Sequence, residues 1–180
     1  MKSYMVISNP HQRKNVGGRP AIIVNNTKFN IENLTQTIVT IPWGLEIVWC
    51  ALSPKNVNNS SIIKKIIVAA VYCKPGSRKK TMLLDHISQT FHTLSAKYGD
   101  GTHWIISGDT NELKLDSILH LDSKLKQCVD QPTRLNPDAM LDPIITDLHK
   151  FYQTPKMGCT LECILGILIS RFFSFVLLPK

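Results

Sequence analysis

HWIISGDTNEL, residues 103–113, places a short apolar run directly before a group of small polar residues. The run Trp-Ile-Ile at 104–106 is too short and too apolar for a half-exposed strand, which favours a buried one. Gly108 then lets the backbone turn and lets a ligand approach closely. Asp109 and Asn111 are two residues apart, so an extended chain directs both side chains the same way. The stretch predicts a buried strand that presents a carboxylate and an amide at its end.

Length and composition suit one globular domain. The 180 residues are 43% hydrophobic and 19% charged, which lies outside the disordered class. Five scattered cysteines without metal-ligand spacing predict free thiols in a reducing compartment. Because no secretory signal opens the chain, we expect an intracellular, nuclear or cytoplasmic location and no secretion.

The positive charge is unevenly distributed along the chain. Residues 1–80 hold 12 lysines and arginines against 2 acidic residues, whereas residues 81–180 hold 9 against 11. A basic half next to a mildly acidic half suits a protein that binds phosphates with one part and a divalent cation with the other. Many basic domains bind nothing anionic, so charge alone leaves nucleic-acid binding open.

Hydrophobic patterns predict strands with helices between them. Strands are expected at 20–25, 45–53, 60–72, 103–107 and 140–147, an extended segment at 126–134, and helices at 77–98 and 113–121. Pro143 inside the last strand places that strand at a sheet edge or at a bulge. We expect an α/β fold, a layered α/β sandwich with a mixed β-sheet.

The two ends of the chain differ from its middle. Residues 1–19 are polar and predict a loose N-terminal segment, residues 20–155 form the predicted domain, and residues 156–180 are an apolar tail outside it. Residues 163–178 are apolar around a central Arg171. A membrane span needs about 20 apolar residues, and a central arginine costs roughly 2.5–3.5 kcal/mol on insertion scales. A core helix or strand, or an unrelated tail, is favoured, with a membrane anchor at 163–178 as the alternative.

Two more polar residues stand at predicted strand ends. Tyr72 closes the strand 60–72, where a phenol could contact a phosphate, although a tyrosine there is commonly a core or rim residue. Asp142 in MLDPIIT is costly in an apolar strand unless it is paired or bound, and it also suits a capped turn. Gly-Asp-Thr-Asn at 108–111 is likewise a good turn sequence by itself.

The order of these motifs resembles a known family. A strand with Tyr-x-x-Pro, a helix, an apolar strand with Gly-Asp-x-Asn, and Leu-Asp before another apolar strand follow one another. This order resembles the endonuclease/exonuclease/phosphatase superfamily, and more narrowly the endonuclease domain of non-LTR (LINE-type) retrotransposons. The narrower resemblance covers about residues 15–155 and is carried by GGRPAIIV, LEIVWCAL, VAAVYCKPGS, HWIISGDTNE, CVDQPTR and LDPIITD.

The resemblance implies roles for four residues. Asp109 would orient or deprotonate the attacking water and is the one expected metal ligand, while Asn111 would contact the scissile phosphate. Tyr72 would stabilise the developing charge, and Asp142 would orient a downstream catalytic histidine. The family uses Mg²⁺, a hard cation that neutralises charge at the reacting phosphorus. DNA is the implied partner, with no small-molecule cofactor.

The sequence departs from the family pattern at both ends. No strand before PAIIV ends in the family's asparagine or metal-binding glutamate, and Glu46 lies within a different strand and does not match. A Ser-Asp-His segment is also missing, because His149 follows Asp142 too closely. We therefore expect an incomplete fold and a fragment, truncated at both ends, of a Mg²⁺-dependent DNA endonuclease with weak or no activity. The alternative is a non-catalytic, basic nucleic-acid-binding remnant.

Overall fold

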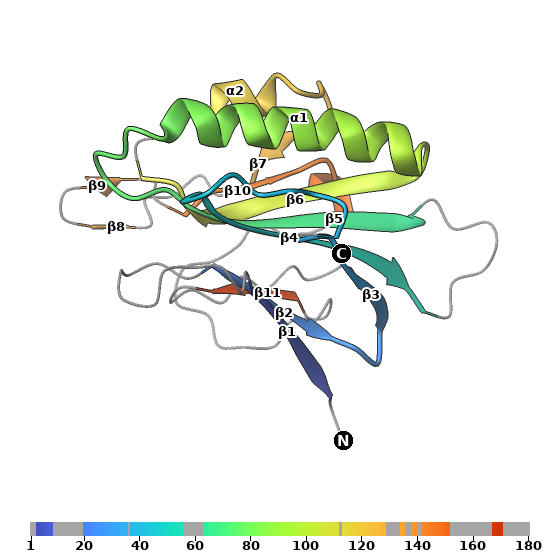
Figure 1. Ribbon diagram of the computed structural model, residues 1–180. Coiled ribbons are helices and arrows are strands. Elements are labelled where there is room, and N and C mark those ends of the chain that lie inside the picture. The colour runs from blue at the N-terminus through green and yellow to red at the C-terminus, as the bar shows by residue number, and fades with distance from the viewer. Residues whose placement is uncertain are drawn as a thin grey trace.

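The protein has three layers, with helices on one face of a six-stranded sheet and a small second sheet on the other (Figure 1). The computed structural model describes residues 3–8, 20–35, 37–55, 63–111, 113–128, 134–135, 138–139, 142–151 and 167–170. The large sheet is mixed, since one of its strand pairs is parallel and the others are antiparallel. The predicted α/β sandwich with a mixed sheet is therefore confirmed.

The six-stranded sheet has the order β3-β4-β5-β6-β10-β7, and only β5 and β6 run parallel. Its strands are β3 (Phe29–Asn33), β4 (Glu46–Pro54), β5 (Lys65–Tyr72), β6 (Thr102–Asp109), β10 (Ile144–Thr146) and β7 (Lys126–Gln127). The second sheet is antiparallel and consists of β1 (Tyr4–Ser8), β2 (Ala21–Asn25) and β11 (Ile167–Ser170). The remaining elements are the short pair β8 (Arg134–Leu135) and β9 (Asp138–Ala139), the helices α1 (Lys80–Tyr98) and α2 (Asp116–Leu119), and the 3-10 turn η1 (His149–Phe151).

The central strands are apolar on both faces because both faces are covered. In β4, Trp49 belongs to the core beneath the helices, while its neighbour Val48 belongs to the core beneath the second sheet. In β5, Ile67 and Val68 divide in the same way. Side chains alternate across a strand, so a strand covered on both sides reads as a continuous apolar run.

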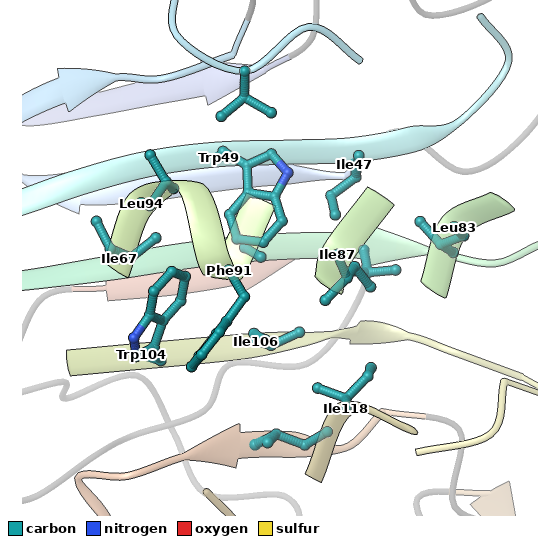
Figure 2. Packing of buried hydrophobic residues seen from close by; sticks show 14 of the residues in the cluster. Ile47, Trp49, Ile67, Leu83, Ile87, Phe91, Leu94, Trp104, Ile106 and Ile118 are labelled. Carbon is teal, nitrogen blue, oxygen red and sulfur yellow. The ribbon is translucent and has the colours of Figure 1, made fainter. Parts of the chain in front are cut away.

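Helix α1 holds the upper layer through one apolar stripe. Leu83, Ile87, Phe91 and Leu94 recur at helical spacing and are all buried. Phe91 lies against Trp104 of β6, with ring centroids 4.2 Å apart (Figure 2). Each such side chain contributes roughly 1.5–3 kcal/mol by leaving water. Burial of this stripe fixes α1 across the sheet.

Two segments at the ends of the chain form strands. Residues 4–8, expected in a loose segment, pair with β2 as β1. Residues 167–170, expected in a tail outside the domain, pair with the other side of β2 as β11. The rest of 156–180 lies outside the described residues, and the domain boundaries remain a prediction. No helix in the described part of the chain is long and apolar enough to cross a membrane.

Strand β10 lies in the interior of the sheet, so the expectation of an edge strand or a bulge around Pro143 is wrong. The strand begins at Ile144, after the proline, and has β6 on one side and β7 on the other. The proline therefore stands where its missing N–H costs no ladder hydrogen bond. The helix expected at 113–121 is also shorter, since α2 covers only Asp116–Leu119.

Candidate active site

Tyr72 and Asp109 end the two parallel strands side by side. They are the last residues of β5 and β6, and they are register partners in the ladder that joins these strands. The pairing continues one step further, because the Cys73 N–H donates to the Asp109 carbonyl oxygen at 2.8 Å. Ligands in open α/β sheets commonly bind beyond the carboxyl ends of the strands. The two predicted residues thus meet at the edge where chemistry is expected.

Gly108 brings β6 unusually close to β5 just before Asp109. Its φ of +138° is a conformation that L side chains rarely adopt. A Cβ added there would lie 2.0 Å from the carbonyl oxygen of Val71, its register partner. Only glycine fits this position, and its geometry sets the direction in which the chain presents Asp109.

Asn111 is held in a left-handed conformation by its own side chain. Its φ is +45°, a region that asparagine tolerates better than most residues. Its Nδ2 donates to the Cys73 carbonyl oxygen at 2.8 Å and to Oδ1 of Asp109. Both neighbours are acceptors, so only the NH₂ group can face them. The amide links the ends of β5 and β6 and orients the carboxylate.

This geometry refines the role expected for Asn111. An amide NH₂ has two hydrogens, and Cys73 and Asp109 take both. The amide therefore has no further hydrogen for a phosphate in this arrangement. Its Oδ1 can still accept a hydrogen bond, for example from a water next to Asp109. In this arrangement Asn111 acts by positioning Asp109, and its predicted contact with the phosphate stays a prediction.

Strand register brings two more acidic residues to the same level of the sheet. Glu46 begins β4 and pairs with Tyr72. Asp142 stands two residues before Ile144, which pairs with Ser107, so it reaches the level of Asp109. We call Glu46, Tyr72, Asp109 and Asp142 the polar row; all four are half-buried. The structure thus brings Tyr72, Asp109 and Asn111 together and adds Glu46, while Asp142 lies two residues beyond the last pair of the β6–β10 ladder and its site role stays a prediction.

The sequence alone gave no role to Glu46, because it lies within a different strand from the one that carries the family's metal-binding glutamate and does not match that glutamate. Only the pairing of β4 with β5 places it opposite Tyr72. Side chains two residues apart share a face, and both Val48 and Ala70 lie in the core beneath the second sheet. Glu46 and Tyr72 therefore share that face. An acid at the first position of an otherwise apolar strand was the available signal.

The described residues do not fit a resident Mg²⁺ ion by themselves. Carboxylate oxygens are the right donors for this hard cation. However, no three acidic, histidine or cysteine side chains of the described residues gather closely enough to hold a metal. The three carboxylates of the polar row instead lie on three different chain segments, with β5 between the segments of Glu46 and Asp109.

A basic segment borders the polar row. Residues 74–80, which lead from β5 to α1, contain Lys74, Arg78, Lys79 and Lys80, and no acidic residue follows until Asp85. Lys74 and Arg78 are exposed. Because the segment leaves β5 directly after Tyr72, its positive charge begins two residues from one member of the polar row and favours an anionic ligand near that end of β5.

A histidine–aspartate pair lies at the opposite end of β6. His103 Nδ1 is 2.7 Å from Oδ2 of Asp147, and Oδ1 of Asp147 accepts the Trp104 N–H at 2.8 Å. Such a pair could serve catalysis, but six residues of extended chain separate His103 from Asp109, roughly 20 Å. The pair ties β6 to the segment after β10 and takes no part in the polar row.

Comparison with known proteins identifies the fold. No family model matches the chain, and no curated protein matches it either. The human Nocturnin catalytic domain with bound sulfate anion superposes with a TM-score of 0.52 at 14% identity, over 94% of this chain and 65% of that one. A functionally unknown conserved protein from Enterococcus faecalis V583 gives 0.51 at 14% identity, over 80% and 65%. The chain has the fold of the endonuclease/exonuclease/phosphatase superfamily.

The likeness concerns the fold alone, because the identities are low. This chain spans 65% of the length of each of these two solved structures. Any activity of this chain therefore depends on its own residues in the polar row and in the basic segment 74–80.

Proposed function

We propose that this chain carries the core of a phosphodiesterase domain that cleaves DNA, of the kind found in LINE-type retrotransposon endonucleases. The observation that supports it most is the carboxylate–amide unit of Asp109 and Asn111, set beside Tyr72 at the carboxyl ends of β5 and β6. The superfamily fold agrees with it, as does the basic segment that borders the site. The retrotransposon assignment rests on the sequence motifs alone.

The chemistry follows from what each group can donate or accept. Asp109 takes the proton of a water that attacks phosphorus, and Asn111 keeps its carboxylate in place. Tyr72 donates its hydroxyl hydrogen to a non-bridging phosphate oxygen as negative charge develops there. The bond between phosphorus and the leaving oxygen breaks opposite the incoming water, and that oxygen takes up a proton from solvent. No step is assigned to a metal, because the described residues do not gather a set of ligands.

We expect weak turnover. The catalytic unit of the family is incomplete here. The described residues contain no set of three groups that could hold a metal, and the sequence contains no Ser-Asp-His segment. Removing one member of a catalytic unit commonly costs orders of magnitude in rate.

We further propose an intracellular, nuclear or cytoplasmic location, which a fluorescent fusion would test.

A nicking assay on supercoiled plasmid tests the proposal. We expect slow conversion to open circles in Mg²⁺ buffer, and none with Asp109→Asn, which keeps an oxygen for Asn111. Asp100→Asn is the matched control, because Asp100 is exposed in the turn at the far end of β6. Nicking that survives Asp109→Asn would show that the activity comes from a contaminant or another site.

The second candidate is a non-catalytic nucleic-acid-binding protein. The basic segment favours it, and so does the absence of a metal-ligand cluster in the described ranges. It predicts DNA binding that weakens steeply with salt, because bound phosphates release counterions. Such binding without nicking at any Mg²⁺ concentration would replace the first proposal with this one.

Carbonate extraction would test the remaining alternative, a membrane anchor at 163–178.

A further inference from the structure

Trp43 is unusually exposed for a tryptophan. At 76% it is the most exposed of the large apolar side chains in the described part of the chain. It occupies the corner of a tight turn in which the Leu45 N–H donates to the Pro42 carbonyl oxygen at 3.1 Å. Gly44 supplies the positive φ, +79°, that the third position of such a turn requires. The indole therefore stands at a fixed corner and faces solvent.

Lys79 ties this corner to the basic segment. Its Nζ donates to the Trp43 carbonyl oxygen at 2.9 Å and lies 4.8 Å from the centroid of the indole ring. A cation at this distance is attracted by the ring face. The backbone N–H of Lys79 is in turn held by Oγ of Ser77 at 3.1 Å. The exposed ring and the cations of residues 74–80 thus form one surface, which we call the Trp43 platform.

The Trp43 platform borders the polar row. Trp43 lies three residues before Glu46, and the segment that ends in Lys79 begins directly after Tyr72, its register partner. In Figure 1, the chain leading into β4 and the chain leading into α1 come together at the same side of the large sheet. Three residues of chain span at most about 11 Å, so Trp43 stands within a few nucleotide lengths of the polar row.

The chemistry of the surface selects its ligand. An exposed flat ring offers a π-face, and the surrounding positive charge disfavours cationic partners and attracts anionic ones. Unpaired nucleotides present a flat base next to a phosphate, which matches both features. Proteins that hold single strands combine the same two elements, a basic track and aromatic rings on which bases stack.

We propose that Trp43 is a stacking platform for an unpaired nucleobase of a nucleic-acid strand, whose adjoining phosphates are held by Lys74, Arg78 and Lys79. This deepens the proposed function, on which it rests in taking nucleic acid as the substrate class. The platform lies outside the polar row, so it sets where the strand lies and takes no part in bond cleavage.

Tryptophan fluorescence isolates this residue. The sequence holds three tryptophans, and the other two, Trp49 and Trp104, are 0% and 4% exposed. Acrylamide quenching in the full chain therefore reports on Trp43. In EDTA, addition of oligothymidylate should lower the quenching of Trp43, and oligouridylate should do the same because both strands present a base face. Quenching that neither strand changes would overturn the proposal.

Affinity measurements supply the second test. Stacking of one base on an aromatic ring increases affinity by roughly 5- to 150-fold. Trp43→Ala should weaken oligothymidylate binding within that range, whereas Trp43→Phe should retain most of the affinity. Tyr4→Ala is the matched control, since Tyr4 is an exposed aromatic residue of β1, in the second sheet, and should change nothing.

The two proposals can fail separately. Binding is measured in EDTA, so it does not depend on turnover. Equal affinity for the parent chain and Trp43→Ala would refute the platform, even if Asp109-dependent nicking were found. Conversely, protection of Trp43 without any nicking would support the platform and refute the catalytic proposal.

Discussion

Replacing Gly108 by alanine should damage the fold at the point where Asp109 is presented. The new Cβ would lie 2.0 Å from the Val71 carbonyl oxygen and 2.8 Å from its nitrogen. Both atoms belong to the backbone of β5, which is fixed between β4 and β6. A side chain could rotate away from such an overlap, but this backbone can move only if the sheet itself opens.

Two costs add at this position. Holding a residue with a Cβ at a sparsely populated φ costs of order 1–3 kcal/mol. Forcing an extra carbon into a well-packed site costs about 1–3 kcal/mol more. We expect Gly108→Ala to lower the free energy of unfolding by about 4 kcal/mol, a large share of the roughly 5–15 kcal/mol typical of a domain. For a chain of this size that corresponds to a fall in Tm of roughly 8–16 °C.

Gly76→Ala separates the two costs. Gly76 also has a positive φ, +66°, but a Cβ there would meet nothing within 4 Å. It should therefore lose only the conformational part, about 1–2 kcal/mol. Urea denaturation followed by circular dichroism measures both variants. If the two variants lost the same free energy, the close approach of β6 to Val71 would not be what requires glycine, and the reasoning would be wrong.

Two further predictions concern groups whose ionisation depends on folding. Burial and a 2.9 Å hydrogen bond to Glu32 raise the pKa of Tyr98 to about 12, so the free energy of unfolding should fall as pH rises from about 10 towards 12. Glu32→Gln should lower the pKa of Tyr98 measured from phenolate absorbance. An unchanged titration would refute the role of Glu32 in raising this pKa. Burial lowers the pKa of His86, whose neutral Nε2 accepts the Trp49 indole N–H at 3.2 Å. The folded protein therefore favours neutral His86, and the free energy of unfolding should decline as pH falls below about 6.5. His86→Ala should cost about 1–3 kcal/mol in denaturant titrations at neutral pH by leaving that N–H unpaired, and it should remove the acid slope, whereas a slope that persisted would assign it to other groups.

The stretch 103–113 contained enough local information to place a buried strand and its polar end. Apolar runs identified β2, β4, β5 and β6, and helical spacing identified α1, because covered faces and amphipathic stripes leave periods in the sequence. The strands β1 and β3 were missed because runs of five residues are too short to show a clear period, and β11 lies in the apolar run 163–178, where a core strand was one of the alternatives left open. Pro143 misled the placement of β10, because the sequence shows a proline near a strand but not whether the strand starts after it.

By itself the sequence determined which residue types stand at the strand ends, and hence the chemistry available to Tyr72, Asp109 and Asn111. Only the tertiary structure decided that Glu46 joins them and that the Asn111 amide donates its hydrogen bonds to Cys73 and Asp109. The physical reason is that a side chain's chemistry is local, whereas its neighbours are set by strand register. Register depends on the packing of whole layers, which no short stretch of sequence contains.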